Sequence, residues 1–594
     1  MKEILKPWQG WLLFGFAMAI VFALGVVISF LTERRPEVVN AVYRKKTEIT
    51  GIEARSSLFS DNYQREYKTW VDTTSIDSRS DMNGRISIDV LAQRPEMVIL
   101  WAGYAFSKDY SSPRGHMYAL DDLRHSLRTG APMHAGDGPQ PASCWMCKSP
   151  DVPRMVAAIG VDSFYNNKWA TWGTEIVNPV GCADCHEPKN MDLHISRPSL
   201  VEAFQRQGRD ITQASPQEMR SLVCAQCHSE YYFKGDIKYP TFPWDKGFTV
   251  EDLEKYYDEI GFTDYVHKLS RAPILKAQHP DYEIFQIGIH GQRGVSCADC
   301  HMPYNDEGGI KYSDHHIQNP LAVTERTCQT CHRDNKETLC NNVYERQRKA
   351  NELRALLEKD LAKAHIEAKF AWDKGATENE MKEVLQLIRQ AQWRWDFGVA
   401  SHGGSFHAPQ EIMRILGHGL NKTFQARMAI NKILVSHGYT DDVPLPDITT
   451  KEKAQQYIGL DMAAEKAGKE ALFLRCRGRL RLFCLRGGRR GASDRHLGLD
   501  GNLRVFLLGL IVDGDFERCF FQGSGIRLDG SMFSLGLGFG LGLGFGFALA
   551  CGFGLGFDGG FAFAPLALFN LLSGHEIFLG VFCHISHGGR KRGR

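Results

Sequence analysis

The chain has 594 residues, with 71 Lys and Arg against 69 Asp and Glu and a formal net charge of +2. This length is enough for a large core, and the near balance of charges lacks the basic excess typical of a polyanion-binding protein. We therefore expect no nucleic-acid partner.

The first predicted element is an apolar helix within residues 1–36. Residues 11–31 are an uncharged run preceded by Lys2 and Lys6. Its length suits a membrane-spanning helix better than the short hydrophobic region of a signal peptide. No clear A-x-A cleavage site follows, so an uncleaved anchor is favoured over a removed signal peptide. Either reading puts the folded part on the periplasmic side of the cytoplasmic membrane.

Residues 37–340 are predicted to form short helical segments broken by Gly, Pro and five C-x-x-C pairs. Four pairs precede a histidine, as in c-type haem attachment sites, where two thiols bind the haem vinyls and the next side chain reaches the iron. Zinc or dithiol sites also use such pairs, but the adjoining histidines argue against them. Five covalently bound haem c groups are therefore expected, replacing much of the core. The motifs are Cys144, Cys147 and Lys148; Cys182, Cys185 and His186; Cys224, Cys227 and His228; Cys297, Cys300 and His301; and Cys328, Cys331 and His332.

One motif carries Lys148 where the others have histidine. An ammonium cannot bind iron, so Lys148 must lose its proton, which burial beside a metal makes possible. If no distal histidine caps this iron, its opposite face stays open to a small molecule. A degenerate motif without haem is the alternative, but both thiols, Cys144 and Cys147, are present.

Residues 341–470 are predicted to form long amphipathic helices, because apolar residues recur there at three-and-four spacing between charged ones. One helix is predicted over 409–436, with Gly438 as its stop. These helices could form a subunit interface or an intrachain bundle packed on the haem region. The expected fold class is mainly α: a compact haem-packed multihaem cytochrome c followed by long C-terminal helices.

Residues 471–594 differ in character, with an arginine-rich stretch followed by Gly alternating with Leu and Phe. The uncharged stretch 531–557 is apolar enough for a membrane span, but each interior Gly costs roughly 1 kcal/mol of helix stability relative to Ala. A Gly-rich domain is possible; a frame-shifted or non-native tail is our preferred interpretation.

Four histidine motifs, one C-W-x-C-K motif and their order resemble the pentahaem cytochrome c nitrite reductases, the ammonia-forming family, over about residues 81–439. The resemblance does not extend closely to the N-terminal helix or to the tail. It implies six-electron reduction of nitrite to ammonium at the lysine-ligated haem, with four bis-histidine haems relaying electrons. It further implies a membrane-bound tetrahaem quinol dehydrogenase as donor and a homodimer formed through the long helices.

The resemblance assigns Arg128, Tyr231 and His279 to the pocket beside the Lys148 haem. These residue types suit nitrite reduction, because the guanidinium of an arginine attracts the nitrite anion. Tyrosine and histidine can donate protons as N–O bonds break. Without the resemblance, we would interpret Arg128 as a surface cation on a helix, Tyr231 as an aromatic residue packed on a haem, and His279 as a haem ligand.

The resemblance also implies a calcium ion beside the active site. Its protein ligands would be Glu230, the carbonyls of Tyr231 and Lys276, and Gln278. Oxygen donors of these kinds suit a hard cation. The ion would hold the loops that carry Tyr231 and His279 in fixed relation.

Each bis-histidine haem needs a second ligand, and the resemblance selects four. His116 would serve the third haem, His290 the fifth, His316 the second and His407 the fourth. His315 and His402 are neighbours that could compete on sequence grounds.

Two other functions stay open at this point. A pure electron-transfer cytochrome would have six ligands on every iron and no substrate site. A related reductase would act on hydroxylamine or sulfite.

Overall fold

The computed structural model describes residues 7–42, 45–75, 87–131, 140–487, 570–573 and 576–579. The chain divides into two compact units, Met1–Leu485 and Arg486–Arg594. In the second unit the described residues are the end of α20 (Met462–Gly487) and one antiparallel pair of strands, β7 (Asn570–Ser573) and β8 (Glu576–Leu579). The remainder of the predicted tail, from residue 488 on, lies outside the described residues.

The N-terminal apolar run is part of one helix, α1 (Pro7–Val42). Within it, Trp8–Ser29 has a mean hydropathy of 2.6 and none of it is buried inside the protein. By length and composition this stretch can cross a membrane. A signal sequence near the N-terminus has the same properties, so both interpretations given above stay open.

Short helices and turns dominate the region of the haem motifs. Several begin at a side chain that accepts a hydrogen bond from the first turn, as Ser215 does for α10 and Thr249 for α11. The helices are α2 (Gln64–Val71), α3 (Val90–Gln93), α4 (Glu96–Leu100), α5 (Ala119–His125), α6 (Asp151–Ile159), α7 (Val161–Tyr165), α8 (Cys182–Cys185), α9 (Pro198–Arg206), α10 (Pro216–Ala225), α11 (Val250–Glu259), α12 (Asp281–Ile287), α13 (Ile289–Gln292) and α14 (Cys297–His301).

Ten 3₁₀ turns are interspersed among the described elements. They are η1 (Ser56–Phe59), η2 (Asp72–Thr74), η3 (Ala105–Ser107), η4 (His116–Tyr118), η5 (Leu127–Thr129), η6 (Ala142–Trp145), η7 (Trp169–Trp172), η8 (Ile211–Gln213), η9 (Pro320–Val323) and η10 (Cys328–Thr330).

Among the described residues of the first unit, strands are confined to three antiparallel hairpins. They pair β1 (Tyr232–Lys234) with β2 (Tyr239–Thr241), β3 (Tyr265–Val266) with β4 (Pro273–Ile274), and β5 (Tyr304–Glu307) with β6 (Ile310–Ser313). The predicted mainly α class is confirmed.

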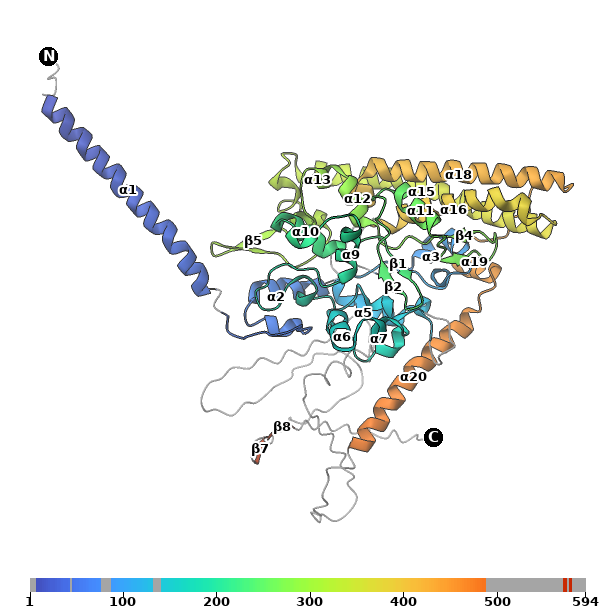
Figure 1. Ribbon diagram of the computed structural model, residues 1–594, viewed down its shortest axis with the longest axis horizontal. Coiled ribbons are helices and arrows are strands. Elements are labelled where there is room, and N and C mark those ends of the chain that lie inside the picture. Colours follow the sequence, from blue (N-terminus) through green and yellow to red (C-terminus); the bar gives the residue numbers. More distant parts are fainter. Residues whose placement is uncertain are drawn as a thin grey trace, which may run out of the picture. The chain divides into compact units, whose positions relative to one another are not determined.

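Three long helices lie side by side after the last haem motif (Figure 1): α15 (Lys336–Asp373), α16 (Glu378–Ala400) and α18 (Pro409–Ser436). Asn335 caps α15, and Thr377 forms a capping box with Glu380 at the start of α16. α18 has the predicted bounds, beginning with proline in its first turn. The shorter α17 (Gly404–His407) and α19 (Lys451–Tyr457), and the longer α20 (Met462–Gly487), complete the first unit.

Tryptophans fill the core between the long helices and α4. Trp101, Trp393 and Trp395 are fully buried, and the rings of Trp101 and Trp395 lie 5.4 Å apart. Gly419 of α18 allows close approach of the helices, because a Cβ there would lie 3.0 Å from Leu357 of α15. The predicted helical bundle is thus an intrachain packing.

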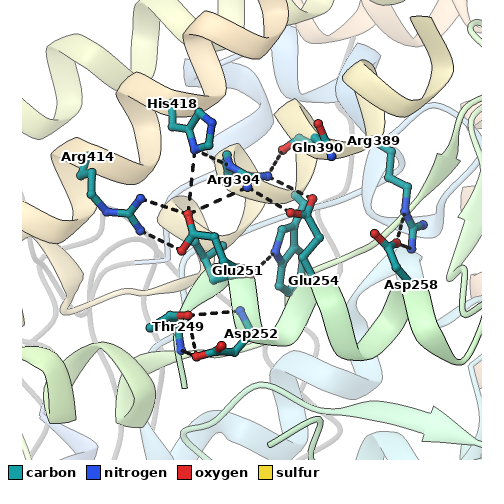
Figure 2. Close-up of polar contacts among 12 residues, drawn as sticks. Thr249, Glu251, Asp252, Glu254, Asp258, Arg389, Gln390, Arg394, Arg414 and His418 are labelled. Carbon is teal, nitrogen blue, oxygen red and sulfur yellow. Dashed lines mark hydrogen bonds and ion pairs between the residues drawn. The ribbon is translucent and has the colours of Figure 1, made fainter. Parts of the chain in front are cut away.

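Ion pairs join the long helices to α11, which lies within the haem-motif region (Figure 2). Arg394 of α16 donates two hydrogen bonds of 3.0 Å to the Glu254 carboxylate, and both side chains are largely buried. Arg414 of α18 contacts Glu251 at 2.9 Å in a more exposed position. These contacts fix the bundle against the region that carries the haem sites.

Candidate haem and active site

Each C-x-x-C pair lies in or beside a single helical turn. Cys182 and Cys185 bound α8, and Cys297 and Cys300 lie in α14. Side chains three residues apart share one face of a helix, so both thiols can face the same haem. All ten motif cysteines are outside disulfides and are therefore available for thioether bonds.

Four histidines face the histidines of the C-x-x-C-H motifs across a gap of nearly constant width. Two metal–imidazole bonds of about 2 Å each, together with the ring radii, span such a gap, so the pairs fit axial ligation of a haem iron from both sides. The ring-centre distances are 6.2 Å for His116 and His228, 6.1 Å for His315 and His186, 6.2 Å for His290 and His332, and 6.5 Å for His407 and His301.

For the second motif, the structure places His315 opposite His186, in the position expected for His316. The His315 ring is oriented by Nδ1, which lies 2.9 Å from the Ser313 carbonyl oxygen. The backbone N–H of His316 donates to Asp314. This turn directs His315 toward the second motif. The sequence alone does not show which of the two adjacent histidines has this orientation.

Backbone carbonyls set the tautomer of several of these histidines. Nδ1 of His186 lies 2.7 Å from the Met191 carbonyl oxygen, and Nδ1 of His301 lies 3.0 Å from that of Gln318. A proton held on Nδ1 leaves Nε2 as the metal ligand. Burial lowers the pKa of His186 to about 4, which keeps this imidazole neutral at neutral pH, as ligation requires.

The motifs touch in an order that differs from their order in the chain. The Cys147 thiol of the first motif lies close to Cys227 of the third. Cys224 of the third lies close to Cys297 of the fourth, and Cys185 of the second is near enough to act on it electrostatically. Cys300 of the fourth motif interacts with Cys328 of the fifth. The third motif is therefore the junction of the arrangement.

Two buried polar side chains tie the first three motifs together. Arg197 donates to the carbonyls of Met146 and Ser149 beside the first motif and forms a 2.6 Å ion pair with Asp184 of the second. Gln226 of the third motif donates to the Asp184 carbonyl. Charge-assisted hydrogen bonds of this kind are shorter and stronger than neutral ones, so they fix the motifs relative to one another.

Arg128, Tyr231 and His279 all lie around the first motif. Burial raises the pKa of the Cys144 thiol to about 12, and the nearby charges of Arg128 and Lys148 oppose that shift. Burial also raises the pKa of Tyr231, and the thiols of Cys147 and Cys144 add to the effect. His279 acts electrostatically on Cys147. The three expected pocket residues therefore lie close enough to the lysine motif to act electrostatically on its thiols, and the His279 ring also lies 4.4 Å from that of His228 in the third motif.

The tryptophan of the C-W-M-C-K motif links it to the turn that bears Arg128. Trp145 donates from its indole to the Trp169 carbonyl at 2.8 Å, and Trp169 donates from its own indole to the Thr129 carbonyl at 2.7 Å. Arg128 itself lies over the Phe106 ring, 4.8 Å from its centre. Its guanidinium is therefore held by an aromatic face in addition to the backbone turn.

Asp281 forms an ion pair with His279. The sequence did not predict Asp281 as a site residue. The two side chains contact at 2.9 Å through Nε2 and Oδ2, while the other Asp281 oxygen accepts from the Gly403 N–H. His402 lies near His279, at a ring-centre distance of 4.9 Å, and does not take the place of His407. The order His279–Pro280–Asp281 was the available sequence signal for a carboxylate partner.

The expected cation site is built around a fully buried carboxylate. Glu230 accepts hydrogen bonds from the Gln278 backbone at 2.6 Å and from Tyr257 at 3.0 Å. The Gln278 side chain donates to the Lys276 carbonyl at 3.0 Å, so these three expected ligands are adjacent. The Lys276 amine turns away and forms a 2.8 Å ion pair with Asp396.

Two adjacent buried carboxyl groups, those of Glu230 and Glu283, fit a cation site. Burial raises the pKa of Glu230 well above its usual value and that of neighbouring Glu283 to about 8. In the part of the chain that the structure describes, Glu283 Oε2 accepts no hydrogen bond. Desolvated carboxylates of this kind are stabilised by a nearby cation, and oxygen donors suit Ca²⁺.

A model of the cytochrome c552 family matches residues 55–476. The chain belongs to this family. Cytochrome c-552 from Bacteroides thetaiotaomicron is 72% identical over 470 residues, covering 79% of this chain and 95% of that protein. Cytochrome c-552 from Porphyromonas gingivalis is 66% identical over 467 residues, covering 78% and 94%.

Among solved structures, the chain is similar to the catalytic subunit of the cytochrome c nitrite reductase from Desulfovibrio desulfuricans, which has two calcium sites. The TM-score is 0.61 at 30% identity, over 70% of this chain and 90% of that one. Membership of the cytochrome c552 family makes the protein a mainly α multihaem cytochrome c with covalently bound haem, and an oxidoreductase of the nitrite reductase type.

Proposed function

We propose that this cytochrome c552 reduces nitrite to ammonium at a haem attached through Cys144 and Cys147 and ligated by Lys148. The observation that supports this best is that Arg128, Tyr231 and His279 all lie close enough to that motif to act electrostatically on its thiols. When bound, this haem would supply the iron that holds the nitrogen atom and passes electrons to it.

The protein side chains supply charge and protons. Arg128 attracts the nitrite anion and orients it by charge-assisted hydrogen bonds. Tyr231 and His279 donate protons to the oxygens that leave. Asp281, bound to His279 Nε2, holds that imidazole in one orientation, as carboxylates do for catalytic histidines in other enzymes.

The four histidine motifs form the proposed relay. For the third, fifth and fourth haems we propose His116, His290 and His407 as distal ligands. For the second haem we propose His315 in place of His316, because His315 faces His186. The contact order of the motifs supports a route from the fifth through the fourth and third to the first, with the second as a branch from the third.

We also propose one Ca²⁺ held by Glu230, Gln278 and the carbonyls of Tyr231 and Lys276. It would fix the Tyr231 and His279 segments relative to each other. The buried, hydrogen-bonded Glu230 and the carboxylate of Glu283 support a cation there.

The proposed cellular setting follows from the helices. α1 would anchor the enzyme at the periplasmic face of the membrane, beside a tetrahaem quinol dehydrogenase that donates electrons. The long helices would also form the interface of a homodimer.

The family match ends at residue 476, which supports a non-native tail beyond it. An intact mass would report five haem additions, any N-terminal cleavage and the presence of the tail.

The function is tested on purified holoprotein with an excess of a chemical reductant. We expect one ammonium per nitrite consumed, and one high-spin haem whose spectrum nitrite perturbs. Hydroxylamine and sulfite should give lower kcat/KM values than nitrite. Low-spin, six-coordinate spectra from every haem would instead identify a pure electron-transfer cytochrome.

A further inference from the structure

The turn that carries Arg128 is held by contacts from three directions. Asp109 accepts hydrogen bonds from the Ser126 hydroxyl and the Leu127 N–H at 3.1 and 3.0 Å. The Trp169 indole donates to the Thr129 carbonyl. The third contact comes from Lys469 of α20, more than three hundred residues away in the chain.

Lys469 is buried, with 4% of its surface exposed. Its amine donates to Thr129 Oγ1 at 2.7 Å and to the Gly130 carbonyl at 2.9 Å, and it lies 4.6 Å from the centre of the Trp169 ring. Within the described chain this amine forms no ion pair, and Asp109 acts on it only electrostatically at longer range. Burying a charge without an ionic partner is costly, so these two hydrogen bonds and the ring face must compensate.

Neighbouring residues of α20 pack on the same region. Leu472 is buried with the core that contains Trp145 and Trp169, and Phe473 stacks on His125 at 5.3 Å. Glu465 pairs with Lys108 at 2.6 Å. The first half of α20 is therefore docked on the segment that leads to Arg128.

We propose that Lys469 is a positioning residue for nitrite reduction: its amine fixes the Thr129–Gly130 backbone and thereby the direction of the Arg128 guanidinium. This inference rests on the proposed function. Since Arg128 would bind the substrate anion, a loosened turn should weaken nitrite binding more than it slows the chemical steps.

The test measures nitrite binding to the oxidised holoprotein without turnover, from the perturbation of the high-spin haem spectrum. For Lys469→Met, which keeps the length but not the donor, we expect the nitrite Kd to rise about tenfold, as for loss of charge-assisted hydrogen bonds. Under turnover, KM should rise more than kcat falls. Lys466→Met is the matched control, because Lys466 is exposed on the same helix and should leave Kd within twofold.

A double-mutant cycle separates positioning from general destabilisation. In an Arg128→Ala background, Lys469→Met should weaken nitrite binding no further. An unchanged Kd for Lys469→Met, or an equal loss in both backgrounds, would overturn the inference. If Lys469→Met gives no holoprotein, Lys469→Gln is the second variant, because it retains a hydrogen-bond donor without the charge. Its nitrite Kd should lie between those expected for the wild type and for Lys469→Met. A Kd equal to that of the wild type would count against the positioning role of Lys469.

The same cycle distinguishes the two proposals. If Arg128→Ala leaves the nitrite Kd unchanged, the proposed role of Arg128 fails. If Arg128→Ala weakens binding and Lys469→Met does not, the positioning role alone fails.

Discussion

The haem-motif region and the long-helix bundle are built by different means. The bundle of α15, α16 and α18 is ordered by apolar periodicity and capping, and tryptophans fill its core. The haem-motif region has short helices, few strands and many hydrogen bonds from side chains to backbone. Arg197 alone joins the first two motifs through two such hydrogen bonds and one ion pair.

The difference shows where each region obtains its stability. Helices of more than twenty residues bury a continuous apolar face and can be stable through packing. Turns of four residues such as α8 cannot, so they need covalent haem and buried polar contacts to hold their shape. Losing a haem should therefore damage the first region far more than the second.

The largest effect is expected at the junction of the motifs. Replacing Cys224 and Cys227 together by alanine should remove one haem by mass. It should also lower nitrite reduction by a chemical donor by about two orders of magnitude or more, because the third motif contacts three others. Replacing Cys328 and Cys331 in the same way removes a terminal haem and should cost less. Equal losses from both variants would contradict the contact order.

The sequence predicted the two regions unequally well. The periodicity of residues 409–436 predicted α18 to the residue, because an amphipathic helix is a local pattern with local stop signals. The C-x-x-C motifs can be recognised in the sequence because attachment chemistry fixes their spacing, and haem attachment at each of them stays a prediction. The sequence could not decide whether His315 or His316 faces the second motif, because the orientation of these side chains depends on a turn made by Asp314 and Ser313.

Contacts across the chain were also beyond the sequence. The Lys469 amine bound to Thr129, and the Lys276 amine paired with Asp396, join segments whose proximity no local pattern encodes. These partners are ordinary polar residues, and their roles emerge only from the packing around them.

In the bundle, the buried ion pair of Arg394 should matter more than an exposed one. Arg394→Ala leaves Glu254 buried without its bidentate partner and should lower the free energy of unfolding by about 3–5 kcal/mol. Arg414→Ala, at the more exposed Glu251 pair (Figure 2), should cost about 1 kcal/mol or less. Denaturant midpoints of the two variants, with haem spectra as a check on the other region, make this comparison. Similar losses would show that burial is not the deciding factor.

Arg128→Ala should impair catalysis with little effect on stability. Loss of an anion-binding guanidinium should lower kcat/KM for nitrite by about a hundredfold, mainly through KM. Arg154→Ala is the control, because it removes a partly exposed arginine that lies near the same motif and pairs with Asp151. A variant at Arg128 with normal KM would remove the main support for the substrate pocket.

The smallest effect concerns a histidine pair at the junction of the two regions. His267 and His365 are fully buried, and their rings stack at 3.7 Å. His365 lies 2.9 Å from Ser270 Oγ and 2.6 Å from Gln392 Oε1. Burial lowers the pKa of His365 to about 4, so the imidazole stays neutral in the folded protein while it takes up a proton in the unfolded chain below about pH 6.5.

Stability from this histidine is therefore complete above about pH 6.5 and declines as the pH falls toward 4. Between pH 7 and pH 5, His365 should account for about 2 kcal/mol of lost unfolding free energy. His365→Gln keeps a side chain that can hydrogen-bond Ser270 or Gln392 but does not titrate. Its loss of stability over this interval should be smaller than that of the wild type by that amount, measured from urea midpoints. Because the haem-ligand histidines titrate in both proteins, their contribution cancels in the difference. If the unfolding free energies of the wild type and of His365→Gln fall in parallel with pH, the buried His267–His365 pair takes up a proton without a loss of stability. The acid sensitivity would then belong to the haem-motif region alone.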